Sequence, residues 1–558
     1  MYYLNNLFTG CLKMIKCYRL PLIISIISAL SALSLSGCGG GDGITAPNTP
    51  PASSGVTPPT QDNTPKWTAG VFKPSDDFKN SCETPRSGSD PYNNNAPYPD
   101  KAGSALYEKL WLRSWSNETY LWYDEIIDKN PNNFLSVDDY FAQLKTDQLT
   151  DSGAKKDNYH YFEPTEDYYK EAQSGVTSGY GINWTFIGDS SDRVLRVAYL
   201  EDNSPASNAG FKRGDRVIKV DGVSITSNTQ VGIDTLNEGL FSPTNGDSHT
   251  IVVLGNDGFE KSFTVTAGNI EQTPVQNVKT IIAQNNKTVG YMQFNSHISI
   301  AQDELISAVN KFKADNIDEL VIDFRYNGGG VLALSAQLAY MVAGSANIQE
   351  RFYYQTQQND KLPAESPFPF IDEEIDYSTY YTTGEQLPDL NLSKVYVLST
   401  SNTCSASEAF INGLKGIDAE VVLIGDTTCG KPYGFNPTHN CATTYYTIQF
   451  SGSNYKGFGE YAAGFTPTPS PQFAADIKGC SVRDDFENQL GDPNEAILAT
   501  ALYHIENNSC PINIASAKEK ATPAGFANAT NSLKPLTIPS RFKRTNMDLT
   551  RPKYSEKD

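Results

Sequence analysis

The chain has 558 residues, of which 39% are hydrophobic and 19% are charged, so it is long enough for two or three packed domains. Its formal net charge is −20 at pH 7. Nucleic acid is excluded as a partner, because an acidic chain with few basic clusters lacks the lysines and arginines that neutralise phosphates. The acidity instead favours solubility in an exported protein.

The N-terminal segment has the features of an exported, lipid-modified protein. Scattered basic residues precede an apolar run, Leu22 to Leu35, that is too short for a comfortable membrane span. The run ends in Leu35-Ser36-Gly37-Cys38, the residue order of a bacterial lipobox. Residues 1–38 are therefore predicted to be a lipoprotein signal peptide with its lipobox, cut before Cys38. Acyl chains on Cys38 would then anchor the protein stably in a membrane. The alternative is an ordinary signal peptide with an incidental cysteine.

The lipobox predicts a location in the cell envelope. Gly39 rather than aspartate follows the cysteine, which favours the outer membrane, with the protein facing the periplasm or the cell surface. Residues 39–66 are rich in Gly, Pro, Thr and Ser and cannot bury a core, so they are predicted to be a flexible linker.

Residues 67–175 are predicted to form an N-terminal helical region. Its apolar residues recur with helical spacing and are interrupted near Asn117, which predicts two amphipathic helices. These residues are Leu106, Leu110, Trp111, Trp115, Leu121 and Trp122. We expect the aromatic side chains to lie in a core.

Residues 176–270 show short β-rich runs separated by turn residues. The stretch from Ser204 to Asp215 resembles the helix and turn of a PDZ domain, and Val220-Asp221-Gly222 resembles the turn that follows. In such a domain the N–H groups of a carboxylate-binding loop, here Tyr180, Gly181 and Ile182, hold the C-terminus of a peptide. The alternative is a PDZ-like fold that serves only as a structural lid.

Residues 271–511 alternate short apolar runs with amphipathic stretches, which predicts an α/β core with helices packed against a mixed sheet. The predicted fold class is therefore a mixed α+β chain, in which an N-terminal helical region and an inserted PDZ-like β-rich domain precede this core. Between Ser345 and Leu392 lies a Tyr- and Pro-rich insertion, predicted to lie on the surface near the cleft. Residues 512–558 read as a polar C-terminal tail.

Three short motifs in the core supply the parts of a hydrolytic centre. They are Ser405-Ala406-Ser407-Glu408, Gly430-Lys431, and the stretch from Asp323 to Gly330, which ends in three glycines. A serine hydroxyl needs a base to take its proton as it attacks a carbonyl. None of the five histidines stands in a familiar serine-hydrolase context, whereas burial can lower the pKa of a lysine until the amine is a base.

The predicted catalytic pair is therefore Ser405 and Lys431. The N–H of Ala406 and a glycine N–H from Gly329 or Gly330 would form the oxyanion hole. We expect Glu408 to cap the helix after the nucleophile rather than to take part in the chemistry.

The order and spacing of these motifs resemble the C-terminal processing (tail-specific) peptidases, S41-type serine peptidases with a PDZ domain. The likeness runs from about Leu106 to about Ile505. It implies a lipid-anchored serine endopeptidase that hydrolyses exported proteins or peptides by a Ser/Lys mechanism without a cofactor, and an adaptor protein is a conceivable partner. The alternative is a catalytically inactive binding lipoprotein of the same fold, with a peptide or an apolar ligand.

One position departs from the family pattern. Members often carry a glutamine four residues after the lysine, where it orients the amine, but this chain has Phe435, which cannot form that hydrogen bond. Either His439 or Asn436 orients Lys431, or the pair works as a dyad, or activity is lost.

Six cysteines follow Cys38, an even number that predicts disulfides in an oxidising compartment. They are Cys82, Cys404, Cys429, Cys441, Cys480 and Cys510. The alternative is that some of these cysteines bind zinc. No Cys-x-x-Cys pair is present, so no metal is expected. Because Cys429 and Cys441 flank the lysine, we predict that they form a disulfide.

Overall fold

The structure is a computed structural model that describes residues 65–150, 153, 155–187, 193–241, 243–512, 536 and 547–554. The predicted signal peptide, its Cys38, nearly all of the linker and most of the C-terminal tail lie outside these residues. Within the described ranges, no helix has the length and apolar composition that crossing a membrane requires.

The N-terminal region contains one long helix, α1 (Ala105–Thr119), where the sequence predicted two. Past Thr119 the N–H of Leu121 donates to the carbonyl of Ile448 at 2.8 Å, so pairing with the core ends the helix. The predicted core aromatics Trp111 and Trp115 are buried. The other elements are η1 (Ser75–Asp77), β1 (Ser81–Cys82), β2 (Ser89–Asp90), β3 (Ala96–Pro97), β4 (Lys101–Ala102), η2 (Tyr123–Glu125), η3 (Pro131–Asn133), α2 (Val137–Phe141) and α3 (Thr165–Ser174).

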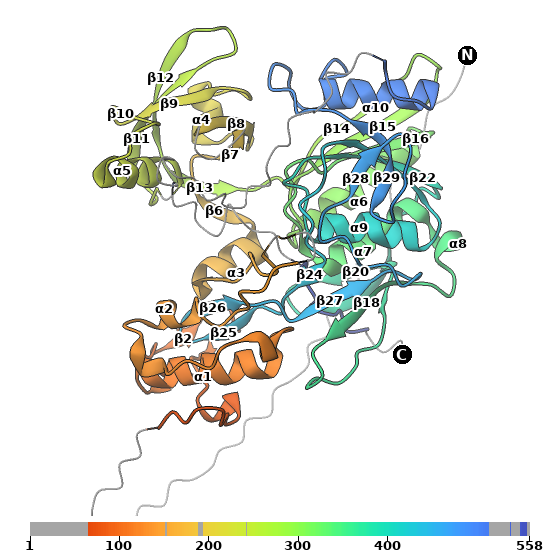
Figure 1. The fold of residues 1–558 in the computed structure, drawn as a ribbon. Coiled ribbons are helices and arrows are strands. Elements are labelled where there is room, and N and C mark those ends of the chain that lie inside the picture. The colour runs from red at the N-terminus through yellow and green to blue at the C-terminus, as the bar shows by residue number, and fades with distance from the viewer. Residues whose placement is uncertain are drawn as a thin grey trace, which may run out of the picture. The chain divides into compact units, whose positions relative to one another are not determined.

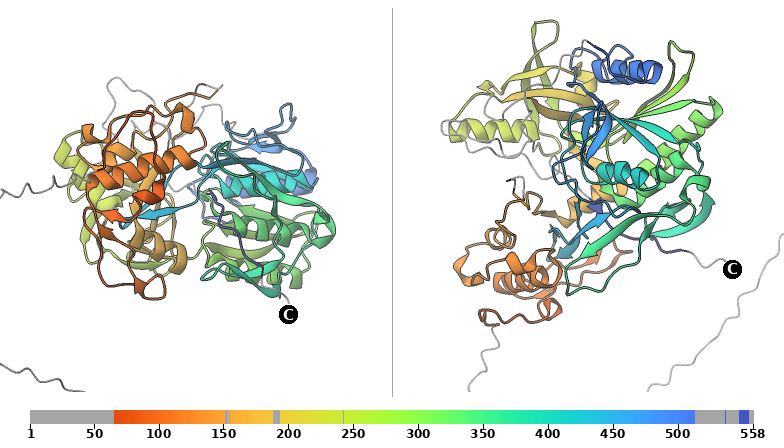
Figure 2. Two further views of the ribbon diagram at one scale, coloured as in Figure 1. Left: turned by 90° about the horizontal axis from the view of Figure 1, so that it is seen from below. Right: turned by 45° about the vertical axis from the view of Figure 1, so that its right-hand side comes forward.

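A strand joins this region to the core. Strand β5 (Tyr161–Pro164) pairs antiparallel with β26 (Thr443–Tyr446), which in turn pairs with β25 (Thr438–Asn440). Strand β26 therefore reaches from the core into the N-terminal region (Figure 2). Segments about 280 residues apart in sequence thus share one small sheet.

The PDZ-like region is entered and left through the antiparallel pair β6 (Val176–Gly179) and β13 (Gly268–Glu271). Its sheet has the order β12-β11-β9-β8-β7, so β7 lies at the edge. The apolar faces of this sheet and of helix α5 share one buried core. The elements are β7 (Ile182–Ile187), β8 (Val194–Leu200), α4 (Pro205–Ala209), β9 (Arg216–Val220), β10 (Val223–Ser224), α5 (Gln230–Phe241), β11 (Ser248–Leu254) and β12 (Glu260–Thr266).

The core is built on a seven-stranded sheet of order β14-β15-β16-β22-β23-β29-β28. Only β14 runs antiparallel to its neighbour, so the sheet is mixed but largely parallel, as the alternating pattern predicted. The strands are β14 (Val275–Ile282), β15 (Thr288–Phe294), β16 (Glu319–Asp323), β22 (Lys394–Ser399), β23 (Glu420–Gly425), β28 (Thr466–Thr468) and β29 (Asp476–Ser481).

Helices cover both faces of this sheet (Figure 1). On one face α6 (Ala301–Ala314), α7 (Leu332–Ala343) and α9 (Ala406–Gly416) contribute to the largest apolar cluster. On the other face α10 (Ala496–Asn507) packs in a second cluster. The mixed α/β fold class with a PDZ-like region is thereby confirmed.

The Tyr- and Pro-rich insertion is less superficial than predicted. Its strand β18 (Phe352–Gln358) pairs with β27 (Phe450–Ser453), and β27 pairs with β24 (Tyr433–Gly434), close to the predicted base. Tyr353 and Tyr354 of β18 are buried because they pack in the core cluster. The remaining elements are α8 (Ser345–Ile348), β19 (Phe368–Pro369), β20 (Glu373–Asp376) and β21 (Tyr381–Gln386).

Residues 547–554 of the C-terminal tail lie against the core. Strand β30 (Met547–Asp548) pairs in parallel with β17 (Gly330–Val331), the strand that contains the last glycine of the Gly-rich motif.

Candidate active site

Ser405 stands at the junction between β22 and helix α9, immediately before the first residue of the helix. Its backbone φ is 60°, a left-handed value that is strained for a residue with a side chain. The residue is fully buried, and its Oγ has no hydrogen-bond partner within the described chain. A strained turn thus holds an unpaired hydroxyl at the N-terminus of a helix, where a reacting group could meet it.

Lys431 follows β23 on a loop, and its side chain is fully buried. The Nζ lies 3.8 Å from the centroid of the Phe435 ring and 4.7 Å from that of Tyr159. Burial lowers the pKa of the amine well below its ordinary value, against the opposing influence of the Asp157 and Glu408 carboxylates. A lysine in this setting can be neutral and accept a proton near neutral pH.

The aromatic ring at position 435 therefore touches the lysine amine, although it cannot form the hydrogen bond of the usual glutamine. The two residues proposed from sequence make other contacts: His439 Nδ1 lies 2.8 Å from the Thr444 hydroxyl, and the Asn436 N–H donates to the Gln449 side chain at 2.7 Å. Sequence reasoning missed Tyr159, because it lies more than 200 residues from the lysine, in the N-terminal region, and belongs to no motif.

Glu408 connects the two predicted catalytic loops. Its carboxylate accepts the N–H of Ser405 at 2.9 Å and the N–H of Lys431 at 2.8 Å, both on Oε2. Its Oε1 accepts the N–H of Gly430 at 2.8 Å and the Thr428 hydroxyl at 2.6 Å. Glu408 does cap the helix, as expected, but it also fixes the loop that carries the base, which the sequence did not indicate.

The disulfides differ from the predicted pairing. Cys429 is joined to Cys404, with 5.2 Å between the Cα atoms, and not to Cys441. Cys441 is joined instead to Cys82 of the N-terminal region, and Cys480 to Cys510. The prediction of a Cys429–Cys441 bridge was wrong because proximity in sequence did not reveal that the nucleophile loop lies beside the lysine loop.

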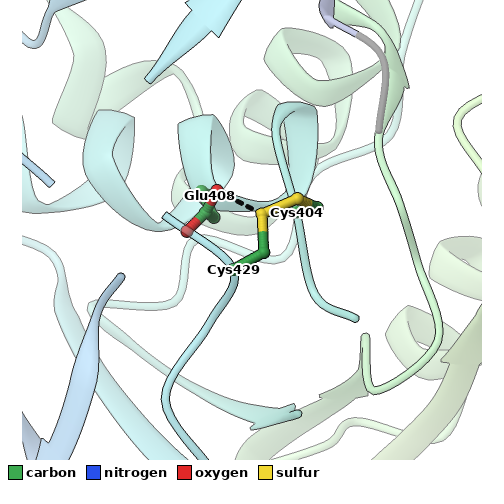
Figure 3. Close-up of side chains that lie close together, drawn as sticks. All are labelled: Cys404, Glu408 and Cys429. Carbon is green, nitrogen blue, oxygen red and sulfur yellow. Dashed lines mark hydrogen bonds between the residues drawn. A yellow bond between two sulfur atoms is a disulfide. The ribbon is translucent and has the colours of Figure 1, made fainter. Parts of the chain in front are cut away.

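Figure 3 shows the Cys404–Cys429 bridge against the Glu408 carboxylate. The three side chains are close enough to suggest a metal site, but the disulfide takes up both sulfur atoms. The bridge joins the residue before the nucleophile to the residue two positions before the base. It therefore links the two loops covalently at the place where Glu408 links them by hydrogen bonds.

The three backbone N–H groups predicted to form the oxyanion hole differ in whether they already have a hydrogen-bond acceptor. Gly329 donates its N–H to the Asn327 side chain at 2.9 Å, so this group is already engaged. Gly330 has a φ of 136°, and a Cβ there would lie 2.2 Å from the carbonyl oxygen of His297, so only glycine fits. The N–H of Ala406 is the first of helix α9 and has no acceptor within the helix. Of the two glycines offered by sequence, Gly330 remains the candidate.

A buried ion network supports the Gly-rich motif. The guanidinium of Arg325 contacts Asp323 at 2.7 Å, Asp484 at 2.9 Å and Glu495 at 2.9 Å. Arg213 of the PDZ-like region also reaches Asp484, at 2.7 Å. The predicted peptide-binding loop of that region, Tyr180 to Ile182, lies at the start of edge strand β7.

Comparison with known proteins agrees with this geometry. Residues 288–442 match peptidase family S41, and residues 196–232 match the PDZ domain. These two regions are therefore similar to an S41 peptidase domain and to a PDZ domain.

Named relatives and a solved structure give the same result. A chloroplastic carboxyl-terminal-processing peptidase 1 of Arabidopsis thaliana is 23% identical over 60% of this chain and 60% of its own. A carboxyl-terminal-processing protease of Picosynechococcus is 25% identical over 47% of this chain and 56% of its own. The chain thus spans less than two thirds of these relatives. A solved S41 protease of Bacteroides fragilis shares the fold, with a TM-score of 0.53, 22% identity and coverage of 74% of this chain and 98% of that one.

Proposed function

We propose that this chain is a serine endopeptidase in which Ser405 attacks a peptide carbonyl and Lys431 accepts the proton of its hydroxyl. The observation that carries the proposal is the Glu408 carboxylate, which accepts the backbone N–H of Ser405 at 2.9 Å and that of Lys431 at 2.8 Å. One buried side chain thereby fixes a strained, unpaired serine relative to a lysine whose pKa burial has lowered. A base with a lowered pKa, on a loop tied to that of the serine, is one part of an activated nucleophile; the other part, a hydrogen bond from the serine hydroxyl to the amine, would form when the substrate binds.

The reaction follows from the same residues. As Oγ of Ser405 bonds to the carbonyl carbon, its proton passes to the neutral amine of Lys431. Negative charge develops on the carbonyl oxygen, where the N–H groups of Ala406 and Gly330 would donate to it. The Lys431 ammonium then gives its proton to the leaving amine, and a water molecule releases the acyl group from Ser405 by the same steps.

The faces of the Phe435 and Tyr159 rings would restrict the lysine amine in place of the missing glutamine. A ring face attracts a cation, so these rings also favour the protonated amine that forms during acylation. The alternative of a catalytically inactive binding protein rests on Phe435 alone, in place of the glutamine that family members often carry.

We further propose that the PDZ region presents substrates. Among the described residues no strand pairs with the outer edge of β7, where an extended peptide could add; the N–H groups of Tyr180, Gly181 and Ile182 would hold its terminal carboxylate. Arg213 would couple a bound peptide to the Gly-rich motif through Asp484. Peptides with a free C-terminus should then be cut faster than their amidated twins, and equal rates would leave the PDZ region as a structural lid.

The anchor is a separate proposal that rests on the sequence alone. Acylated Cys38 would hold the protein at an envelope membrane, and the Gly- and Pro-rich linker would lift the peptidase away from the lipid.

The experiment that tests the activity is hydrolysis of casein by the chain beginning after Cys38, with Ser405→Ala as the control. We expect turnover only with the intact serine. Equal turnover by both proteins would exclude the serine mechanism. No turnover by either protein would favour the alternative, a catalytically inactive binding protein.

A further inference from the structure

The strand that contains the oxyanion candidate Gly330 is not an open edge. Met547 and Asp548 pair in parallel with Gly330 and Val331. On their other side the N–H of Phe435 donates to the carbonyl of Met547 at 2.9 Å. A single extended segment of this chain therefore fills the space between the Gly-rich motif and the loop that carries the predicted base.

The side chains of this segment enter the core. Met547 is fully buried and Leu549 nearly so, and both belong to the largest apolar cluster. Asp548 between them is also buried, and its carboxylate accepts the N–H and hydroxyl of Thr550, two residues along the same segment, at 2.9 and 2.7 Å. Among the described residues this carboxylate finds hydrogen-bond donors only within its own segment, so burying it opposes docking, whereas burying the two apolar side chains favours it.

The Tyr- and Pro-rich insertion holds the remainder of the segment. Lys553 exchanges backbone hydrogen bonds with it, donating to Tyr380 at 2.6 Å and accepting from Thr382 at 2.8 Å. Arg551 forms an ion pair of 3.0 Å with Glu365. Contacts with residues far apart in sequence thus position the segment 547–554, which begins with strand β30.

We propose that the surface formed by β17 and Phe435 is a docking site for an extended substrate peptide, and that residues 547–554 occupy it as an internal competitor. This inference rests on the proposed function. A substrate carbonyl that is to meet the N–H groups of Gly330 and Ala406 must approach the same strand, so the two peptides exclude each other. The site selects an extended segment with apolar side chains at the places of Met547 and Leu549.

The competition predicts opposite effects for two neighbouring substitutions. Leu549→Asp should weaken docking of the segment and raise kcat/KM for a peptide substrate by about tenfold or more. The reason is that the wild-type site binds substrate only during the fraction of time in which the segment is undocked, and its apparent affinity is reduced by that fraction. Asp548→Asn keeps an acceptor for Thr550 but removes the buried charge, so it should tighten docking and lower kcat/KM several-fold. Ile282→Asp, an equal change at an exposed position on β14, is the matched control and should change neither.

A binding measurement separates this inference from the peptidase mechanism. A fluorescein-labelled peptide of residues 545–554 is added to the full chain with Ser405→Ala, and to the same chain with Leu549→Asp as well. We expect saturable polarisation only with the second protein, and none with a scrambled peptide. This result does not depend on catalysis.

Equal binding to both proteins, or binding to neither, would overturn the inference even if casein is cut. If Leu549→Asp lowers the melting temperature sharply, Arg551→Ala replaces it, since its side chain is partly exposed and its loss removes contacts to the Tyr- and Pro-rich insertion alone: the Glu365 ion pair, the bonds to the Ser366 and Pro367 carbonyls and the Phe368 ring contact. An unchanged kcat/KM and no peptide binding in a folded Arg551→Ala protein would also overturn it.

Discussion

Replacing Glu408 by glutamine tests the central connection of the site. The carboxylate has four donors around it, and a protonated carboxyl group would have to donate to groups that already donate. Burial raises the pKa of Glu408, whereas these hydrogen bonds favour the ionised form. The geometry thus favours a buried carboxylate.

Glutamine can place its amide nitrogen toward only one pair of donors. The less costly choice turns the nitrogen to the Oε1 side, where the Thr428 hydroxyl can rotate and accept, and the N–H of Gly430 loses its partner. An orphaned buried N–H costs about 1–3 kcal/mol, and the two bonds that stay lose about 1 kcal/mol each when their acceptor becomes neutral. We expect a loss in unfolding free energy of about 2–4 kcal/mol, after allowing for the relief of burying a charge.

The same change should lower kcat/KM about 100-fold, because the serine and lysine loops lose their common support and small misplacements are expensive. The Glu408 charge raises the pKa of Lys431, so its removal should move the acidic limb of the pH–rate profile to lower pH. Thermal melting and peptide hydrolysis measure these effects, and Glu385→Gln on an exposed stretch of β21 is the control. A Glu408→Gln protein as stable and active as the control would refute this reasoning.

Four further predictions concern the lysine, the ring beside it, the disulfide between the two loops and the lipobox cysteine. Lys431→Arg should be as inactive as Lys431→Ala, because a guanidinium stays protonated, and measurable turnover by the arginine protein would mean that the lysine supplies only charge or packing. Phe435→Ala should lower kcat more than it changes KM, as single-turnover rates would show, whereas an unchanged kcat would remove the ring from the mechanism. A Cys404→Ala, Cys429→Ala double variant, with the other two disulfides intact, should be destabilised by about 3 kcal/mol and be less active, and a double variant as stable and active as the wild type would contradict the bridge. Cys38→Ala should abolish palmitate labelling and entry into a detergent phase, so a variant still acylated at that end would exclude the lipobox.

The core of the fold could be predicted because its local patterns agree with its tertiary structure. Apolar runs such as Val289 to Phe294 and Val421 to Gly425 became β15 and β23 almost residue for residue, since buried parallel strands are continuous hydrophobic runs. Helix α1 was predicted as two helices, because its end depends on pairing of Leu121 with Ile448, which no local pattern records.

The site could be predicted only as far as its motifs reach. Ser405 and Lys431 lie in short recognisable stretches, and a glutamate in the first turn of α9 is an ordinary cap. That the same carboxylate also binds the lysine loop, and that Tyr159 lies against the amine, are consequences of chain packing over long sequence separations. Cysteine pairing failed for the same reason, since the geometry between Cys404 and Cys429 exists only after the two loops meet.

The Cys82–Cys441 bridge closes a loop with a sequence separation of 359 residues, which includes most of the N-terminal region and the whole PDZ region. A single cut by another protease at an exposed turn within that loop would leave both pieces covalently attached. A nicked molecule would therefore migrate at full mass on a non-reducing gel and separate into two bands only after reduction. Without the bridge, a cut after β5 would leave the N-terminal piece, with Tyr159 and β5, attached to the core only by non-covalent contacts such as the pairing of β5 with β26.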